Sequence, residues 1–128
     1  MKTILFVCTG NTCRSPMAEC MMNALLDRRG INDIRALSAG ICADAGAPAS
    51  SGAKRAMLRR GLSLESHRSR PVTGALLESA GMVVCMSQSH LNALRARFPA
   101  LSWRPDRHVA FVTTQELEDM YPDLTPKQ

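Results

Sequence analysis

The segment TILFVCTGNTCRSP, residues 3–16, joins a short apolar run to a polar loop and then to the start of a helical pattern. Residues 3–7 are apolar and partly β-branched, as expected of a parallel strand that is buried on both faces. Residues 16–29 carry apolar side chains at helical spacing on one face. We expect Ser15 to cap this helix and Pro16 to occupy its first position. The segment therefore predicts a strand–loop–helix unit.

The same alternation continues along the chain. Further strands are predicted at residues 34–38, 82–86 and 108–112, and further helices at residues 50–60, 73–80 and 89–98. Strands separated by helical stretches are typical of right-handed βαβ units, in which helices cover a parallel sheet. The sequence thus predicts the α/β fold class, with one four-stranded parallel sheet and helices on both faces. Residues 1–128 are expected to form a single domain.

Composition excludes several classes of protein. The chain has 128 residues, of which 45% are hydrophobic and 21% charged, which is ordinary for a globular protein. Its apolar runs are too short to cross a membrane, and its first residues do not resemble an export signal. We therefore expect a cytoplasmic protein with no membrane partner. Five cysteines, an odd number, argue against a disulfide framework.

The net charge of +5 has two interpretations. Clustered basic residues can bind nucleic acid, but here they are scattered and few aromatic residues lie between them. We expect no nucleic-acid partner and instead a mildly positive field that attracts anionic substrates. His67, His90 and His108 do not cluster with the cysteines at metal-ligand spacing, so no metal and no other cofactor is expected.

The loop after the first strand, residues 8–15, is called the anion loop below. In an open parallel sheet, ligands bind beyond the carboxyl ends of the strands. A short glycine-containing loop that runs into a helix start gathers backbone N–H groups around one point, which suits a phosphate. The residues expected to bind phosphate are Thr9, Gly10, Asn11, Thr12, Cys13 and Ser15.

Two side chains of the anion loop carry reactive chemistry. Cys8 opens the loop, where N–H dipoles, Arg14 and the Ser15 hydroxyl are expected to favour its thiolate form. Arg14 has a planar guanidinium that can bind two oxygens of a phosphate. A thiolate below a phosphoryl group and a guanidinium over its oxygens are the parts needed for displacement at phosphorus through a cysteinyl-phosphate. The competing interpretation is a buried cysteine in an ordinary turn.

The pattern around Cys8 is more specific than its spacing alone. The C-x5-R spacing has roughly 0.5 chance matches in a chain with this many cysteines and arginines. Requiring Ser or Thr after the arginine, and Gly two residues after the cysteine, lowers that number to roughly 0.004.

These residues also carry a family resemblance. The string VCTGNTCRSPMAE resembles the signature of the low-molecular-weight protein tyrosine phosphatases, and Ser38-Ala39-Gly40 and His67-Arg68-Ser69-Arg70-Pro71 resemble further motifs of that family. The resemblance extends over residues 2–116. It implies a four-stranded parallel sheet, a nucleophilic Cys8, Arg14 as the transition-state clamp and Ser15 as support for the thiolate. It further implies that Asn11, Ser38 and His67 hold the loop shape through hydrogen bonds.

Thr12 bears on the choice of substrate. Family members that act on phosphotyrosine usually place Ile or Leu at this loop position, whereas the bacterial protein-arginine phosphatases place Thr. A hydroxyl and a smaller side chain suit a polar guanidinium substrate better than they suit an aryl ring, which gains from an apolar wall. The resemblance therefore favours phosphoarginine over phosphotyrosine, with phosphorylated proteins and inorganic phosphate as partners. The alternative is that Thr12 only packs against neighbouring side chains and does not select the substrate. The sequence does not indicate an oligomeric state.

One feature of the family has no clear counterpart. Its members carry an Asp-Pro-aromatic motif on a late loop, whose aspartate acts as general acid, and then a final helix. This chain has no Asp-Pro, and we expect its C-terminal part to be shortened relative to the family. The nearest analogue is Asp119-Met120-Tyr121, with Asp123 as the alternative; either could instead be a surface carboxylate.

Two other functions remain open at this point. A chain without the acid could be a phosphate-binding module that is weakly active or inactive. An arsenate reductase is less favoured, because that reaction needs further cysteines near the third strand's end, and Cys85 has no partner there.

Overall fold

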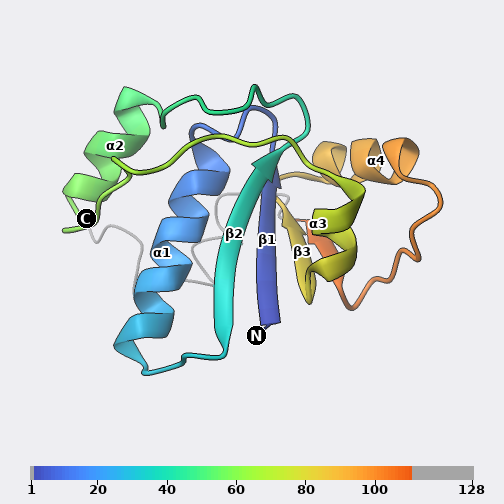
Figure 1. The fold of residues 1–128 in the computed structure, drawn as a ribbon, viewed down its shortest axis with the longest axis horizontal. Coiled ribbons are helices and arrows are strands. Elements are labelled where there is room, and N and C mark those ends of the chain that lie inside the picture. Colours follow the sequence, from blue (N-terminus) through green and yellow to red (C-terminus); the bar gives the residue numbers. More distant parts are fainter. Residues whose placement is uncertain (1, 111–128) are drawn as a thin grey trace.

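A computed structural model describes residues 2–110, and each predicted element is present (Figure 1). The strands are β1 (Lys2–Cys8), β2 (Ile34–Gly40), β3 (Met82–Cys85) and β4 (His108–Ala110). The helices are α1 (Arg14–Arg28), α2 (Ser51–Leu58), α3 (Gly74–Ser79) and α4 (Gln88–Arg97). Their bounds differ from the sequence-based ones by a few residues, which is the usual uncertainty at element ends.

The sheet is parallel throughout, with the strand order β2-β1-β3-β4, which confirms the predicted fold class. Cys8 pairs in register with Gly40 on one side, and Val7 pairs with Cys85 on the other. After β1, the chain therefore forms β2 on one side of β1 and later forms β3 on the other side of β1. Such a reversal opens a crevice beyond the carboxyl ends of the two central strands, where ligands bind in open sheets.

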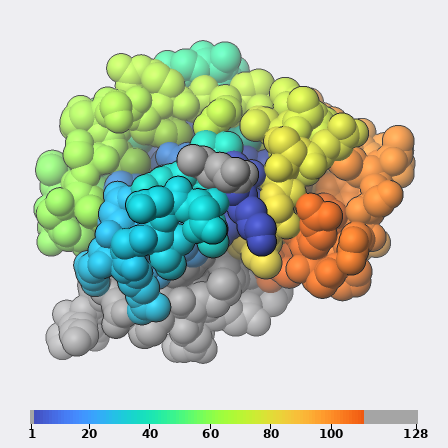
Figure 2. Space-filling view, turned by 60° about the horizontal axis from the view of Figure 1, so that its bottom comes forward, coloured from blue at the N-terminus to red at the C-terminus, as the bar shows by residue number. Residues whose placement is uncertain are grey.

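Alternating side chains of the strands build two separate cores. On one face, a cluster that includes Phe6, Ala36 and Val84 packs with Ala18 of α1. On the other face, Leu5, Val7 and Val83 belong to a cluster with residues of α3 and α4, including Leu77, Leu91 and Leu94. Figures 1 and 2 show the same division, with α1 and α2 on one side of the molecule and α3 and α4 on the other.

Three helices begin with the capping residues that short helices require. The side chains of Ser50, Thr73 and Ser87 accept hydrogen bonds from the third N–H beyond them, at Ala53, Leu76 and His90. The predicted cap of the first helix is wrong. Helix α1 begins at Arg14 after Cys13, which provides no side-chain cap, and Ser15 lies inside the first turn. Its hydroxyl is thereby released for another contact.

Within residues 2–110, no helix is both long and apolar enough to cross a membrane.

The end of β2 packs unusually close to the anion loop. A Cβ added at the buried Gly40 would lie 2.6 Å from the Thr9 carbonyl oxygen and 2.9 Å from the Asn11 nitrogen. Both are backbone atoms and cannot rotate away. Only glycine therefore fits where β2 meets the loop.

We predict that Gly40→Ala lowers the free energy of unfolding by about 1–3 kcal/mol, because the new methyl group overlaps backbone. Gly52→Ala is the matched control: this helical position has nothing within 4 Å of an added Cβ. There, alanine should raise stability by about 0.5–1 kcal/mol. Denaturant unfolding of both variants measures the two effects, and equal stabilisation by both would contradict the close packing at Gly40.

Candidate active site

The anion loop lines a small hollow at the carboxyl end of β1. The hollow has a volume of about 160 Å³ and is bordered by Cys8, Thr9, Gly10, Thr12, Cys13, Arg14 and, from α4, His90. The structure thus brings together most of the residues that the sequence predicts to bind phosphate or to carry the reaction. Asn11 and Ser15 are fully buried behind the wall rather than on it.

Asn11 fixes the shape of the loop. Its backbone has a φ of 56°, in the left-handed region, and its side chain is completely buried. The side-chain amide donates to Ser15 Oγ (3.0 Å) and accepts from the Arg70 N–H (2.9 Å). Its backbone carbonyl accepts from His67 Nε2 at 2.8 Å. Hydrogen bonds from three directions therefore hold the loop in its curved form at Asn11.

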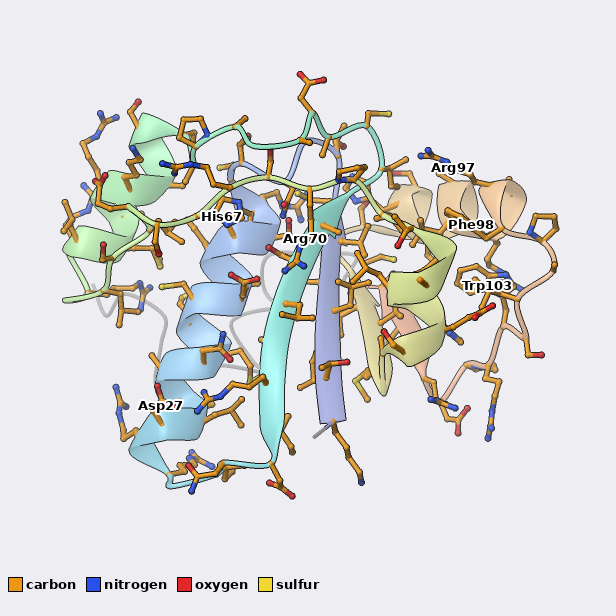
Figure 3. The ribbon with its side chains drawn as sticks, viewed as in Figure 1. Asp27, His67, Arg70, Arg97, Phe98 and Trp103 are labelled. Carbon is orange, nitrogen blue, oxygen red and sulfur yellow. The ribbon has the colours of Figure 1, made fainter. Side chains whose placement is uncertain are left out.

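His67 and Arg70 both come from the connection between α2 and α3. Figure 3 shows the two labelled residues where this connection crosses above α1 and β2. Because a carbonyl oxygen can only accept, His67 must carry its proton on Nε2.

Ser38 is connected to the loop only indirectly. Its carbonyl accepts a hydrogen bond from Arg70 Nε (3.0 Å), and the backbone N–H of Arg70 in turn donates to Asn11. No described loop residue hydrogen-bonds to the Ser38 hydroxyl. The contact of Ser38 with Arg70 is therefore made by its backbone, not by its hydroxyl.

The carbonyl groups of the loop are turned away from the hollow. Those of Cys8 and Thr9 accept from the N–H groups of Ile41 and Cys42 (both 2.9 Å), and that of Thr12 accepts from Ser50 (2.7 Å). In a trans peptide the next N–H points opposite to the carbonyl. The following amides therefore face the other way, toward the hollow, which is the arrangement that binds an anion.

Cys8 is almost completely buried, with 5% of its surface exposed, and lies under the loop. Its Sγ is 2.8 Å from Ser15 Oγ. Because Ser15 Oγ already accepts a hydrogen bond from Asn11, its own proton is available to the sulfur. This contact holds the Ser15 hydroxyl against the sulfur beneath the loop.

Arg14 reaches across the hollow to the end of β3. Its Nη2 donates to the backbone carbonyl of Met86 at 2.6 Å. This bond holds the guanidinium in place along the wall. Met86 could not be predicted as a partner, because only the fold brings these residues together across 72 positions of the chain.

His90 is a residue of the site that sequence reasoning missed. The sequence considers it only as a metal ligand, yet it borders the same hollow as Cys8 and Cys13. Its Nε2 lies 2.8 Å from Thr9 Oγ1. Its position in the first turn of a helix that follows a central strand could have suggested this, since such turns adjoin the crevice.

The predicted general acids, Asp119 and Asp123, both lie outside the described residues. Within residues 2–110, no group of three or more His, Cys, Asp or Glu side chains is arranged to hold a metal ion.

Comparison with known proteins agrees with this geometry. A family model described as low molecular weight phosphotyrosine protein phosphatase matches residues 3–119. A protein-arginine-phosphatase of Bacillus subtilis (strain 168) is 40% identical over 95 residues, which are 74% of this chain and 62% of that protein. The chain therefore spans less than two thirds of that relative's length.

Two solved structures show the same fold. A low molecular weight protein tyrosine phosphatase from T. tengcongensis superposes with a TM-score of 0.78 at 31% identity, covering 97% of this chain and 92% of that one. A YwlE arginine phosphatase mutant with a phosphorylated active site serine superposes with a TM-score of 0.75 at 33% identity, covering 92% and 70%. With the family model matching most of its length, the chain belongs to the low molecular weight phosphotyrosine protein phosphatase family.

Proposed function

We propose that the chain is a cysteine-dependent protein phosphatase that hydrolyses phosphoarginine, and with lower preference phosphotyrosine, on proteins. The observation that carries this proposal is Cys8 Sγ, 2.8 Å from Ser15 Oγ, beneath a loop whose amides face the hollow that Arg14 borders. A buried sulfur with a hydroxyl donor, an amide cradle and a guanidinium supports nucleophilic attack on phosphorus better than it supports any purely structural role.

The reaction proceeds in two displacements. The Cys8 thiolate attacks phosphorus, an S–P bond forms, and the P–N bond of phosphoarginine (or the P–O bond of phosphotyrosine) breaks. The leaving group takes up a proton as it departs. Water then attacks phosphorus, gives up a proton, and breaks the S–P bond, which releases inorganic phosphate and restores Cys8. Arg14 and the loop amides stabilise the charge on the phosphoryl oxygens in both steps.

Related proteins support the covalent intermediate and the arginine substrate. In the YwlE arginine phosphatase mutant, the active site serine is phosphorylated. The Bacillus relative is named a protein-arginine-phosphatase. We extend both properties to this chain, whose loop holds a cysteine at the corresponding place.

Thr12 supports phosphoarginine as the preferred substrate. It borders the hollow with its side chain half-buried. The segment from residue 41 to residue 50, ICADAGAPAS, which hydrogen-bonds the loop carbonyls from behind, contains no aromatic side chain. A guanidinium gains from a polar wall, whereas a phenyl ring gains from an apolar or aromatic one.

Two alternatives are less well supported. A module that binds phosphate without turnover remains the outcome if neither Asp119 nor Asp123 acts as general acid. An arsenate reductase would need a second reactive thiol, and Cys85 does not suit that role: it is fully buried in β3, and burial raises its pKa to about 12.

We predict that Cys8→Ser abolishes turnover but retains phosphate binding, because the amide cradle remains. Release of inorganic phosphate from a phosphoarginine protein and phosphate binding by calorimetry measure the two properties. Turnover by Cys8→Ser near the rate of the unmodified protein would falsify the covalent mechanism.

We predict that Arg14→Lys loses about 10²–10³-fold in kcat, since an ammonium cannot replace a planar bidentate donor. Arg28→Lys, an exposed position at the far end of the same helix, is the matched control and should be unaffected. Equal activities of the two variants would remove Arg14 from the proposed mechanism.

We predict that Thr12→Ile shifts the ratio of kcat/KM for phosphoarginine over phosphotyrosine by about 10- to 200-fold toward phosphotyrosine. Thr12→Val keeps the shape while removing only the hydroxyl, and therefore separates polarity from bulk. An unchanged ratio in both variants would show that Thr12 does not discriminate.

We predict that Asp119→Asn lowers kcat by about 10²-fold, as expected for loss of general acid catalysis, and that Asp123→Asn does not. The measurement is kcat over a range of pH for both variants. The opposite result would transfer the role to Asp123, and no effect from either would leave the weakly active or inactive module as the better description.

A further inference from the structure

A continuous line of hydrogen bonds runs from the first turn of α4 into the anion loop. Ser89 Oγ lies 2.8 Å from Ser87 Oγ, Ser87 Oγ lies 2.8 Å from His90 Nδ1, and His90 Nε2 lies 2.8 Å from Thr9 Oγ1. Ser87 also caps the helix by accepting from the His90 N–H. The imidazole is therefore held at both nitrogens, with one end on the wall of the hollow.

The protons along this line can be arranged in two ways while His90 is neutral. If Nδ1 carries the proton, Nε2 must accept from the Thr9 hydroxyl, and Thr9 then presents only lone pairs to the hollow. If Nε2 carries the proton, it donates to Thr9 Oγ1 and leaves the Thr9 O–H free to donate elsewhere. Since an anion needs donors around it, only the second arrangement makes Thr9 favourable for binding.

We propose that His90 is a positioning residue that turns the Thr9 hydroxyl into a hydrogen-bond donor for the bound phosphoryl group. The proposal rests on the proposed function, because it requires an anion in the hollow. Met86, which directly precedes the cap residue Ser87, supplies the carbonyl that holds Arg14. The junction between β3 and α4 thus orients the side chains of both Thr9 and Arg14.

The surroundings of His90 add a dependence on pH. Burial and the nearby Arg14 lower the pKa of His90 below its ordinary value. The other titratable groups that border the hollow are Cys8 and Cys13, while Ser87, Gln88 and Ser89 of its own turn do not titrate. At neutral pH the free protein therefore holds a neutral imidazole.

An anion in the hollow favours the imidazolium, whose Nε2 can only donate to Thr9. The pKa of His90 is then higher with the anion bound than without it. By linkage, the extra affinity is fully present below the pKa of the free protein and is lost as the pH rises through the pKa of the complex. Anion binding should consequently strengthen toward acid.

The test uses Cys8→Ser protein, which removes the reactive thiol and keeps the amide cradle, and sulfate, whose charge is constant over the pH range. We expect Thr9→Val and His90→Ala each to weaken sulfate binding by about 3- to 10-fold, the worth of one hydrogen bond. The double variant should be no weaker than either single one, because His90 acts through Thr9. His90→Gln, which keeps an N–H donor, should bind sulfate nearly as well at neutral pH.

The pH profile provides the second measurement. In the Cys8→Ser protein, sulfate affinity should rise between about pH 8 and about pH 5.5, whereas with His90→Gln it should stay flat. Gln88→Ala, an exposed neighbour in the same turn, is the matched control and should follow the parent. Thermal unfolding of each variant confirms that the fold is intact.

Three results would overturn the proposal. Independent, multiplying losses from Thr9→Val and His90→Ala would mean that His90 does not act through Thr9. An unchanged pH profile in His90→Gln would assign the titration to another group. If the Cys8→Ser protein binds no sulfate at any pH, the anion cradle itself fails, and the proposed function fails with it.

Discussion

The left-handed backbone of Asn11 is the constraint on which the rest of the site depends. A residue other than glycine in this region costs about 1–2 kcal/mol, although asparagine tolerates it better than most. Three hydrogen bonds, to Ser15, Arg70 and His67, each contribute about 0.5–1.5 kcal/mol and together offset this cost. The bond from His67 holds the Asn11 carbonyl outward, and the bond to Ser15 leaves the Ser15 proton for Cys8. Strain at one residue thus sets the position of both the cradle and the nucleophile.

The sheet topology explains why parts from distant segments meet at this point. Strand β1 is flanked by β2 and β3, so its carboxyl end receives residues from both sides. From the β2 side come Gly40, Ile41 and Cys42, which support the loop from behind. From the β3 side come Met86 and His90, which touch Arg14 and Thr9. Support and orientation therefore come from opposite neighbours of the same strand.

The fold could be predicted almost completely from the sequence, because each strand and helix has a strong local pattern. Apolar runs such as that of β1, and caps such as Thr73, depend on nearby residues alone. The assignment of Ser15 as a cap failed for a tertiary reason: its hydroxyl gains more from the buried Cys8 and Asn11 than from the helix end. The anion loop was visible as a contiguous motif. Its contacts with Arg70, Met86 and His90 were not, because no local pattern encodes which side chains meet across 59 to 81 residues.

The hydrogen bond between Arg14 and Met86 has a consequence for folding. It closes a long segment of chain, as do the bonds from Thr9 to His90 and from Asn11 to Arg70. Such contacts form only after the strands between them have paired, since loop closure must be compensated by other interactions first. The cradle is therefore a late product of folding rather than a preformed local turn. An anion that binds it selects the complete native state, and it stabilises the whole domain by mass action rather than the loop alone.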